Sequence, residues 1–293
     1  MQPIKLDPSY LDPRCVYVSD LDGTLLRDNA ALSVFSLRTL QVLLGNRLPF
    51  TVASARSVAS IRPILRGLDL RLPVIEFNGG FITDLESGQH QVINSIDPAV
   101  AEAIYRLISV SGCVPFISTF NGTDDCLYYH DIINEGMQWY LTDRITNRDE
   151  RLHSTTNLAD SLRDHVVCLT VIDRPDKTEE VRAAVEATLS KTIKTQRSES
   201  LYSPGWSWLT FHDYRATKAQ AIHTVLREYG LAGAELIVFG NGGNDVDMFQ
   251  MADRTIAVAN ATEELKSCAT QIIGPNSEDS VVKFIRDDWH NLD

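Results

Sequence analysis

The stretch CVYVSDLDGT, residues 15 to 24, decides the fold. Its first half is apolar and rich in β-branched residues, as in a strand buried on both faces, and it turns polar at Asp20. Asp20 and Asp22 are two residues apart, so in an extended chain they project to the same side. We therefore expect a buried strand that carries two carboxylates at its carboxyl end, where open α/β sheets bind ligands.

Apolar segments on both sides of this stretch alternate between strand and helix patterns. The alternation predicts an α/β fold with a Rossmann-like parallel sheet and helices on both faces. The expected strands are 15–19, 50–53, 74–77, 236–239 and 255–258, and the expected helices are 31–44, 58–65, 218–229, 247–251 and 280–289. Pro63 should bend or shorten the second helix.

The middle of the chain has a different texture. A hairpin around Gly88, a helix over 99–111, a strand over 165–172 and a helix over 177–190 predict an inserted α+β unit. The early strands need the late ones to complete one sheet. We therefore expect a core made of 1–83 and 205–293, interrupted by a cap over 84–204 that forms a lid.

Composition excludes several classes of partner. The chain has 293 residues, with 27 Lys+Arg against 39 Asp+Glu and a net charge of −12, which disfavours nucleic acid and anionic membranes. No apolar run is long enough to span a bilayer, and the N-terminus lacks an apolar signal core. Five scattered cysteines without a C-x-x-C pair favour a reducing cytoplasm. The oligomeric state stays open.

Two carboxylates held this closely need a cation or a proton to coexist. Mg²⁺ suits the position, because it takes oxygen ligands and commonly combines one or two carboxylates with substrate phosphate. An EF-hand loop starting at Asp20 would place Gly and Glu where Leu25 and Ala31 stand, which argues against calcium. A solvated acidic turn is the alternative without function.

The segment Asp20-x-Asp22-Gly23-Thr24 resembles the first motif of the haloacid dehalogenase-like phosphatases. Further segments follow in the order expected of the Cof-type branch of that family, which carries a large α/β cap. They are Ser54-Ala55-Arg56, Asn78-Gly79-Gly80, Lys218 at the start of a late helix, and Gly240-Asn241-Gly242-Gly243-Asn244-Asp245. The resemblance spans most of the chain and is weakest in the cap.

The resemblance implies a phosphatase that acts on a small phosphorylated metabolite. Asp20 would attack phosphorus and form an aspartyl phosphate, and Asp22 would protonate the leaving oxygen and later activate water. Lys218 would place a fixed positive charge beside the nucleophile. The Asp20 carboxylate and the Asp22 backbone carbonyl would also bind Mg²⁺.

The remaining motif residues are expected to hold the phosphate or the metal. The phosphate or substrate group comprises Gly23, Thr24, Ser54, Ala55, Asn78, Gly79 and Asn244. Asn241 and Asp245 complete the metal site, although Asn241 stands where the family has Asp, which removes one negative charge. Two roles stay open for Arg56, which either contacts substrate or braces its loop, and Asn78-Gly79 is also a good tight turn.

Alternative functions remain. A dinucleotide site at Gly240-x-Gly242 would need a third glycine where Asp245 stands. A phosphotransferase or phosphomutase would use the same motifs, and a phosphometabolite-binding protein would explain the weakened metal site. In the cap, the aromatic residues and arginines are expected to be core and solvated side chains rather than ligand contacts. These are Trp139, Tyr140, Trp206, Trp208, Arg144, Arg148 and Arg151.

Overall fold

The computed structural model describes residues 11–199 and 203–291 and divides the chain into two compact units. One unit comprises the residues up to Val92 and those from Thr217 onward, and the other comprises Ile93–Ala216. We call them the core unit and the cap unit. Within the described ranges, we find no helix with the length and hydrophobicity that crossing a bilayer requires.

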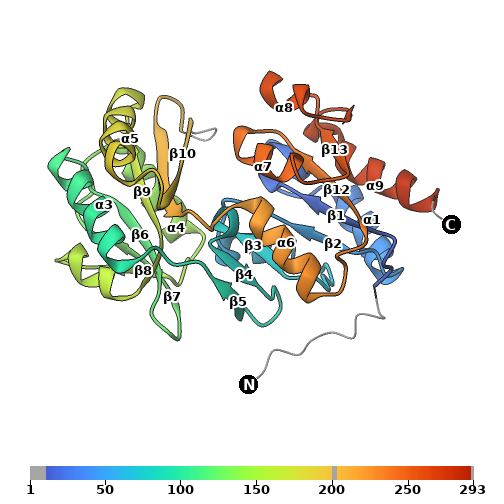
Figure 1. The fold of residues 1–293 in the computed structure, drawn as a ribbon, viewed down its shortest axis with the longest axis horizontal. Helices are drawn as coiled ribbons and strands as arrows, with labels where there is room; N and C mark the ends of the chain where they lie inside the picture. Colours follow the sequence, from blue (N-terminus) through green and yellow to red (C-terminus); the bar gives the residue numbers. More distant parts are fainter. Residues whose placement is uncertain (1–10, 200–202, 292–293) are drawn as a thin grey trace. The chain divides into compact units, whose positions relative to one another are not determined.

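A five-stranded parallel sheet forms the centre of the core unit (Figure 1). Its strand order is β14-β13-β12-β1-β2, and β1 pairs with both β12 and β2, so early and late parts of the chain share one sheet. The strands are β1 (Cys15–Ser19), β2 (Phe50–Val52), β12 (Glu235–Gly240), β13 (Arg254–Ala257) and β14 (Gln271–Ile272). All five residues of β1 are buried, as the apolar run predicted.

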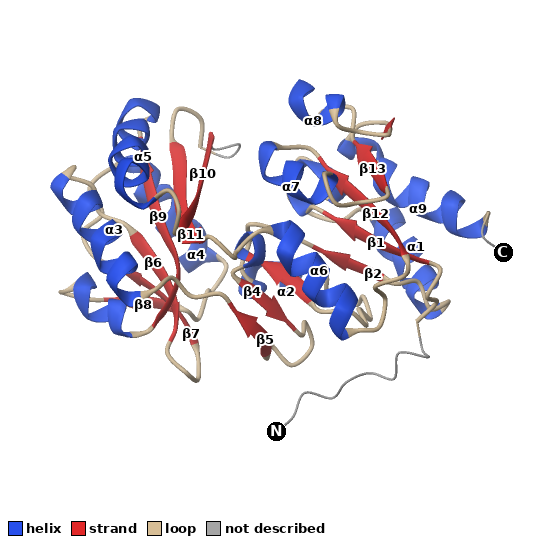
Figure 2. Cartoon of the chain, viewed as in Figure 1, coloured by secondary structure: helices blue, strands red, loops and turns tan. Residues whose placement is uncertain are grey.

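Helices cover both faces of this sheet, which confirms the Rossmann-like prediction (Figure 2). Helix α1 contacts α9, and helix α6 contacts α7; the two pairs lie on opposite faces. The helices of the core unit are α1 (Val34–Gly45), α2 (Val58–Ile64), α6 (Lys218–Glu228), α7 (Val246–Phe249), α8 (Glu263–Ser267) and α9 (Ser280–His290). Pro63 lies inside α2, which is short.

A small antiparallel sheet extends the core unit beyond β2. It consists of β3 (Val74–Glu76), β4 (Phe81–Thr83) and β5 (His90–Ile93), and a parallel bridge from Ala53 to Ile75 joins it to the β2 segment. The hairpin around Gly88 therefore packs with the core. For this reason the first boundary falls after Val92 and not at the expected 83/84.

The cap unit is a six-stranded sheet in the order β10-β11-β9-β6-β7-β8. Helices α3 and α5 contact each other over one face, whereas Met137 of α4 belongs to an apolar cluster with Phe116 and Trp206. The second boundary falls after Ala216 instead of at 204/205, because β11 pairs with β9 and β10. The cap elements are α3 (Pro98–Val110), β6 (Phe116–Phe120), β7 (Asp125–Tyr129), α4 (Glu135–Thr146), β8 (Leu152–Ser154), β9 (His165–Asp173), α5 (Pro175–Leu189), β10 (Ile193–Glu199) and β11 (Ser207–Asp213).

One buried histidine should make the stability of the cap unit depend on pH. His212 in β11 is 3% exposed, and burial lowers its pKa from 6.5 to about 4. Between these values the unfolded chain binds a proton that the folded chain does not, so stability falls as pH decreases through this window. The loss should approach roughly 3 kcal/mol below pH 4.

Urea unfolding at pH 7 and pH 4.5 measures this effect. Trp139, Trp206 and Trp208 lie in the cap unit, so tryptophan fluorescence reports mainly on its unfolding. His212→Phe, which has no titrating ring, should lose less stability than the wild type on acidification. The same loss in both proteins would show that other groups control the pH response.

Candidate active site

The loop after β1 carries the two predicted carboxylates. It runs over Leu21–Leu25 and is kinked at Asp22 and Gly23, where Gly23 has a φ of 70°. A side chain at Gly23 would also meet the side-chain amide nitrogen of Asn241, which can move aside, so the left-handed backbone is what favours glycine here. The Asn260 side chain donates to the Gly23 carbonyl oxygen at 2.8 Å, which fixes the turn from the other side.

Lys218 joins Asp20 to Asp245. Helix α6 begins at Lys218, and the Thr217 side chain caps it by accepting from the Gln220 amide. The Lys218 Nζ donates to Asp20 Oδ1 and to Asp245 Oδ1, both at 2.7 Å. Lys218 is only 1% exposed. A lysine buried in the first turn of a helix opposes the helix dipole, and these two carboxylates compensate for its position.

This buried cluster shifts the titration of its members. Burial raises the pKa of Asp20 to about 7, although the Lys218 ammonium acts in the opposite direction. Burial alone would lower the pKa of Lys218, but the two adjacent carboxylates raise it overall, so the ammonium is held charged. A second cation beside Asp20 would favour its ionised, nucleophilic form.

Asp245 anchors the loop after β12. Its Oδ2 accepts from the backbone N–H groups of Asn241 and Gly242 at 2.9 and 3.0 Å, while its Oδ1 accepts from Lys218. Asp245 is fully buried. The loop is also tied to α8 because the Asn241 carbonyl oxygen accepts from the Thr262 amide. Asp245 therefore holds together the loop and the lysine.

The Asp20 carboxylate has a second partner in its own loop. Thr24 Oγ1 donates to Asp20 Oδ2 at 3.1 Å, and Lys218 donates to the other oxygen. Asp20 is 5% exposed. Thr24 thus orients the predicted nucleophile, and its expected contact with phosphate stays a prediction.

Asp22 pairs with Arg56, which answers part of the question left open for that arginine. Arg56 donates from Nε to Asp22 Oδ2 and from Nη2 to Asp22 Oδ1, each at 2.6 Å. In the same loop, Ser54 Oγ accepts from the Arg56 amide at 3.2 Å. Ala55 is exposed and has no positive φ, so this turn does not need a glycine at that position.

The Asn78-Gly79 turn lies next to the Ser54 loop and to α6. The backbone N–H of Asn78 donates to the Ser54 carbonyl oxygen at 2.9 Å. The side chain of Asn78 accepts at Oδ1 from Asn244 Nδ2 at 3.2 Å. Asn78 adopts a φ of 55°, in the left-handed region that asparagine tolerates. With the contacts of Lys218 and Arg56, hydrogen bonds therefore connect residues of all five segments that the sequence singled out.

Gly79 lets the turn approach the start of α6. A Cβ at Gly79 would lie 2.5 Å from the Thr217 carbonyl oxygen, directly before Lys218. Gly79→Ala should therefore displace Lys218 and lower turnover by about ten-fold, with a stability loss of about 1–3 kcal/mol. Gly233→Ala is the matched control, because nothing lies within 4 Å of its Cβ. Equal turnover in both variants would contradict this role for Gly79.

The oxygen donors around Gly23 are suitable for Mg²⁺. The Asp20 carboxylate, the Asp22 backbone carbonyl and the Asn241 side-chain carbonyl are hard ligands on neighbouring loops. Within the described residues, no three His, Cys, Asp or Glu side chains gather into a metal site. Asp245 already accepts three hydrogen bonds, so its direct contact with metal stays a prediction.

Two supporting residues were missed from the sequence. Asn260 fixes the Gly23 carbonyl and also accepts from the Asn276 amide at 3.0 Å. Glu76 is fully buried and accepts from the Val58 amide and the Thr83 hydroxyl, so it fixes the start of α2 behind the Ser54 loop. The sequence did offer a signal for Glu76, because it is a charged residue inside the apolar run at residues 74–77.

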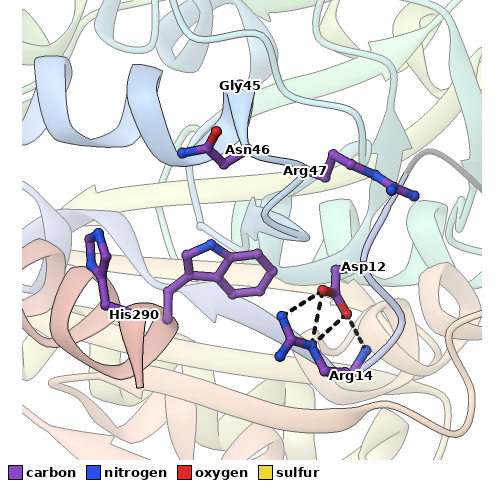
Figure 3. Close-up of a pocket in the computed structure, with 7 residues that line it drawn as sticks. Asp12, Arg14, Gly45, Asn46, Arg47 and His290 are labelled. Carbon is purple, nitrogen blue, oxygen red and sulfur yellow. Dashed lines mark hydrogen bonds and ion pairs between the residues drawn. The ribbon is translucent and has the colours of Figure 1, made fainter. Parts of the chain in front are cut away.

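Other polar features lie apart from this set. A cavity of about 420 Å³ lies near the residues that precede β1, and thus at the opposite end of the strand from Asp20. Figure 3 shows the side chains that line it. Its lining comprises Asp12, Arg14, Gly45, Asn46, Arg47, Trp289 and His290. In the cap unit, Arg144 and Arg151 both form ion pairs with Asp149. The ring centroids of Trp139 and Trp208 lie 6.0 Å apart. These side chains therefore stabilise the cap unit.

Comparison of the sequence with known proteins identifies a family whose members include phosphatases. The family model described as haloacid dehalogenase-like hydrolase matches residues 17–285. A Bacillus subtilis relative, 5-amino-6-(5-phospho-D-ribitylamino)uracil phosphatase YitU, is 22% identical and covers 92% of this chain and 95% of its own. The pyridoxal phosphate phosphatase YbhA of Escherichia coli is 23% identical, with 92% and 97% coverage.

A solved structure shares the fold. It is a haloacid dehalogenase-like hydrolase from Bacteroides thetaiotaomicron, with a TM-score of 0.78, 22% identity, and coverage of 94% of this chain and 99% of that one. The chain therefore belongs to the haloacid dehalogenase-like hydrolase family, as a phosphatase of its Cof-type branch.

Proposed function

We propose that this phosphatase hydrolyses a small phosphorylated metabolite through an aspartyl phosphate on Asp20. The observation that carries the proposal is the position of Lys218, whose Nζ lies 2.7 Å from both Asp20 and Asp245. A buried, permanently charged ammonium beside a carboxylate supports transfer of a phosphoryl group to that carboxylate, because it offsets the charge on the phosphoryl oxygens.

The proposed reaction has two steps. Asp20 attacks phosphorus, the ester P–O bond breaks, and the leaving oxygen takes a proton from Asp22. Asp22 then removes a proton from water, the water oxygen attacks phosphorus, and the bond to Asp20 breaks. The Ser54 hydroxyl accepts from the Arg56 amide and therefore keeps its own proton to donate to a phosphoryl oxygen.

Mg²⁺, held by Asp20, the Asp22 carbonyl and Asn241, would supply further positive charge to the phosphoryl oxygens. Asp245 supports this site by holding the backbone of Asn241 and Gly242. Because Asn241 contributes no charge, we expect this site to bind Mg²⁺ more weakly than the same site with an aspartate at position 241.

Asn241→Asp should strengthen metal binding. The added carboxylate restores one negative charge, so the Mg²⁺ concentration that gives half-maximal activity should fall by about ten-fold. Magnesium titration of phosphate release measures this value, and Asn46→Asp, at an asparagine outside the site, is the control. An unchanged requirement for metal would remove Asn241 from the ligand set.

The names of the relatives suggest where to search for the substrate. They include phosphatases of a ribityl phosphate and of pyridoxal phosphate, so we propose a phosphorylated sugar, sugar alcohol or cofactor of similar size. The five free cysteines support a reducing compartment such as the cytoplasm. A panel of such phosphates, assayed for magnesium-dependent release of inorganic phosphate, tests the proposal.

The panel also separates the alternatives. An isomeric sugar phosphate as product, without free phosphate, would indicate a mutase. Asn241 gives a specific reason to consider a binding protein. Tight binding of a phosphorylated metabolite with no turnover at saturating Mg²⁺ would favour that function and contradict hydrolysis.

A further inference from the structure

Arg56 holds Asp22 through a two-pronged contact. Its Nε and Nη2 donate to the two different oxygens of the carboxylate, each at 2.6 Å. Parallel hydrogen bonds from a planar guanidinium fix the plane of a carboxylate as well as its position. The Asp22 and Arg56 side chains are 29% and 21% exposed, so water only partly screens the pair.

The backbone of Arg56 is itself fixed on both sides. Its amide donates to Ser54 Oγ at 3.2 Å, and its carbonyl oxygen accepts from the Phe77 amide at 3.1 Å. One residue further, Ser57 starts the α2 segment that Glu76 anchors through the Val58 amide. The guanidinium therefore extends from a rigid loop toward a carboxylate on a different loop.

We propose that Arg56 is a positioning residue that orients Asp22 for both proton transfers; this inference rests on the proposed function. A carboxylate has about four lone-pair sites, and the guanidinium occupies one on each oxygen. The site left on each oxygen then has a fixed direction, so that the protonated Asp22 carboxyl group can present its O–H to the leaving oxygen in the first step and an ionised oxygen to water in the second. Arg56 itself forms and breaks no covalent bond.

A substrate contact by Arg56 would give a different kinetic result. Loss of a direct contact with phosphate raises KM for every phosphate ester and costs the same whether or not Asp22 is present. Loss of an orienting contact lowers kcat only for substrates whose leaving oxygen needs a proton from Asp22. It therefore affects an alkyl phosphate more than an aryl phosphate, because nitrophenolate leaves without a proton.

The experiment is a double-mutant cycle of Arg56→Ala and Asp22→Asn on the full chain, with ribose 5-phosphate and 4-nitrophenyl phosphate as probes. With ribose 5-phosphate, Arg56→Ala should lower kcat by about 100-fold and change KM by less than about three-fold. The release of nitrophenol in the first turnover should fall by less than about ten-fold. In the Asp22→Asn background, Arg56→Ala should cost less than about two-fold.

Two further variants make the result independent of folding. Arg56→Lys keeps the charge but not the planar fork, and it should retain little more activity than Arg56→Ala if orientation is the role. Arg62→Ala, at an arginine inside α2 that donates to the Leu85 carbonyl oxygen, should keep wild-type kinetics. Equal thermal melting of these variants would confirm that the losses are not losses of fold.

Two results would overturn the inference, and they are distinguishable. Additive losses in the cycle, or an effect mainly on KM with both probes, would assign Arg56 to substrate binding while leaving hydrolysis intact. Phosphate release that survives Asp20→Asn would instead contradict the proposed function itself, and the orienting role would fail with it.

Discussion

Asp20→Asn should abolish phosphate release and leave the fold intact. The amide is not a nucleophile toward phosphorus, so kcat should fall by a factor of roughly 10⁴ or more. Asparagine has nearly the same shape as aspartate and can keep hydrogen bonds to Lys218 and Thr24. The measurement is phosphate release under the same conditions for both proteins.

The charge of the buried cluster provides the control for this variant. Lys218 faces two carboxylates in the wild type, whereas in Asp20→Asn it faces only Asp245, so positive and negative charges balance. The variant should therefore unfold at the same or a higher urea concentration than the wild type. If Asp20→Asn were inactive because it is unfolded, it would unfold at a lower urea concentration than the wild type. Full turnover by Asp20→Asn would refute Asp20 as the nucleophile.

Lys218→Met should cost both activity and stability. It removes the cation between Asp20 and Asp245 and leaves two buried carboxylates facing each other. Breaking a buried ion pair from one side costs about 3–5 kcal/mol, and losing a cation aimed at the phosphoryl group costs about 10²–10³ in kcat. Hydrogen exchange of the β1 and β12 amides in urea measures the stability of the core unit.

A second substitution separates the two effects. Lys218→Met combined with Asp245→Asn removes one of the unpaired charges, so it should recover part of the stability while activity stays low. Lys283→Met, at an exposed lysine of α9, is the control and should change neither property. If Lys218→Met were as stable as the wild type, Lys218 would not hold the two loops together as the distances indicate.

The sequence predicted the core better than the cap. The buried run that became β1 and the alternation around it were enough to place β2, β12 and β13, because parallel strands covered by helices leave a strong apolar signal. In the cap sheet, which is mostly antiparallel, several strands pair with strands that are not next to them in the sequence. Their order depends on long-range pairing such as β6 with β9, which no local pattern encodes.

The sequence singled out residues of the candidate site by their type, but not by their contacts. The motifs identified Asp20, Lys218 and Asp245, and the structure brings these three within hydrogen-bond distance. The fork between Arg56 and Asp22, and the support that Asn260 gives to Gly23, join residues far apart in the chain. Such pairs depend on loop geometry, so the sequence alone left the role of Arg56 open.

Direct detection of the phosphorylated enzyme tests the central claim most sharply. Asp22→Asn lacks the base for the second step, so after mixing with 4-nitrophenyl phosphate and Mg²⁺ it should accumulate the intermediate. Acid quenching and peptide mass spectrometry should then find one phosphoryl group, on Asp20, in a form that hydroxylamine removes. Rapid turnover by the wild type, with no phosphoryl group on Asp20 in either protein at any time, would contradict the account.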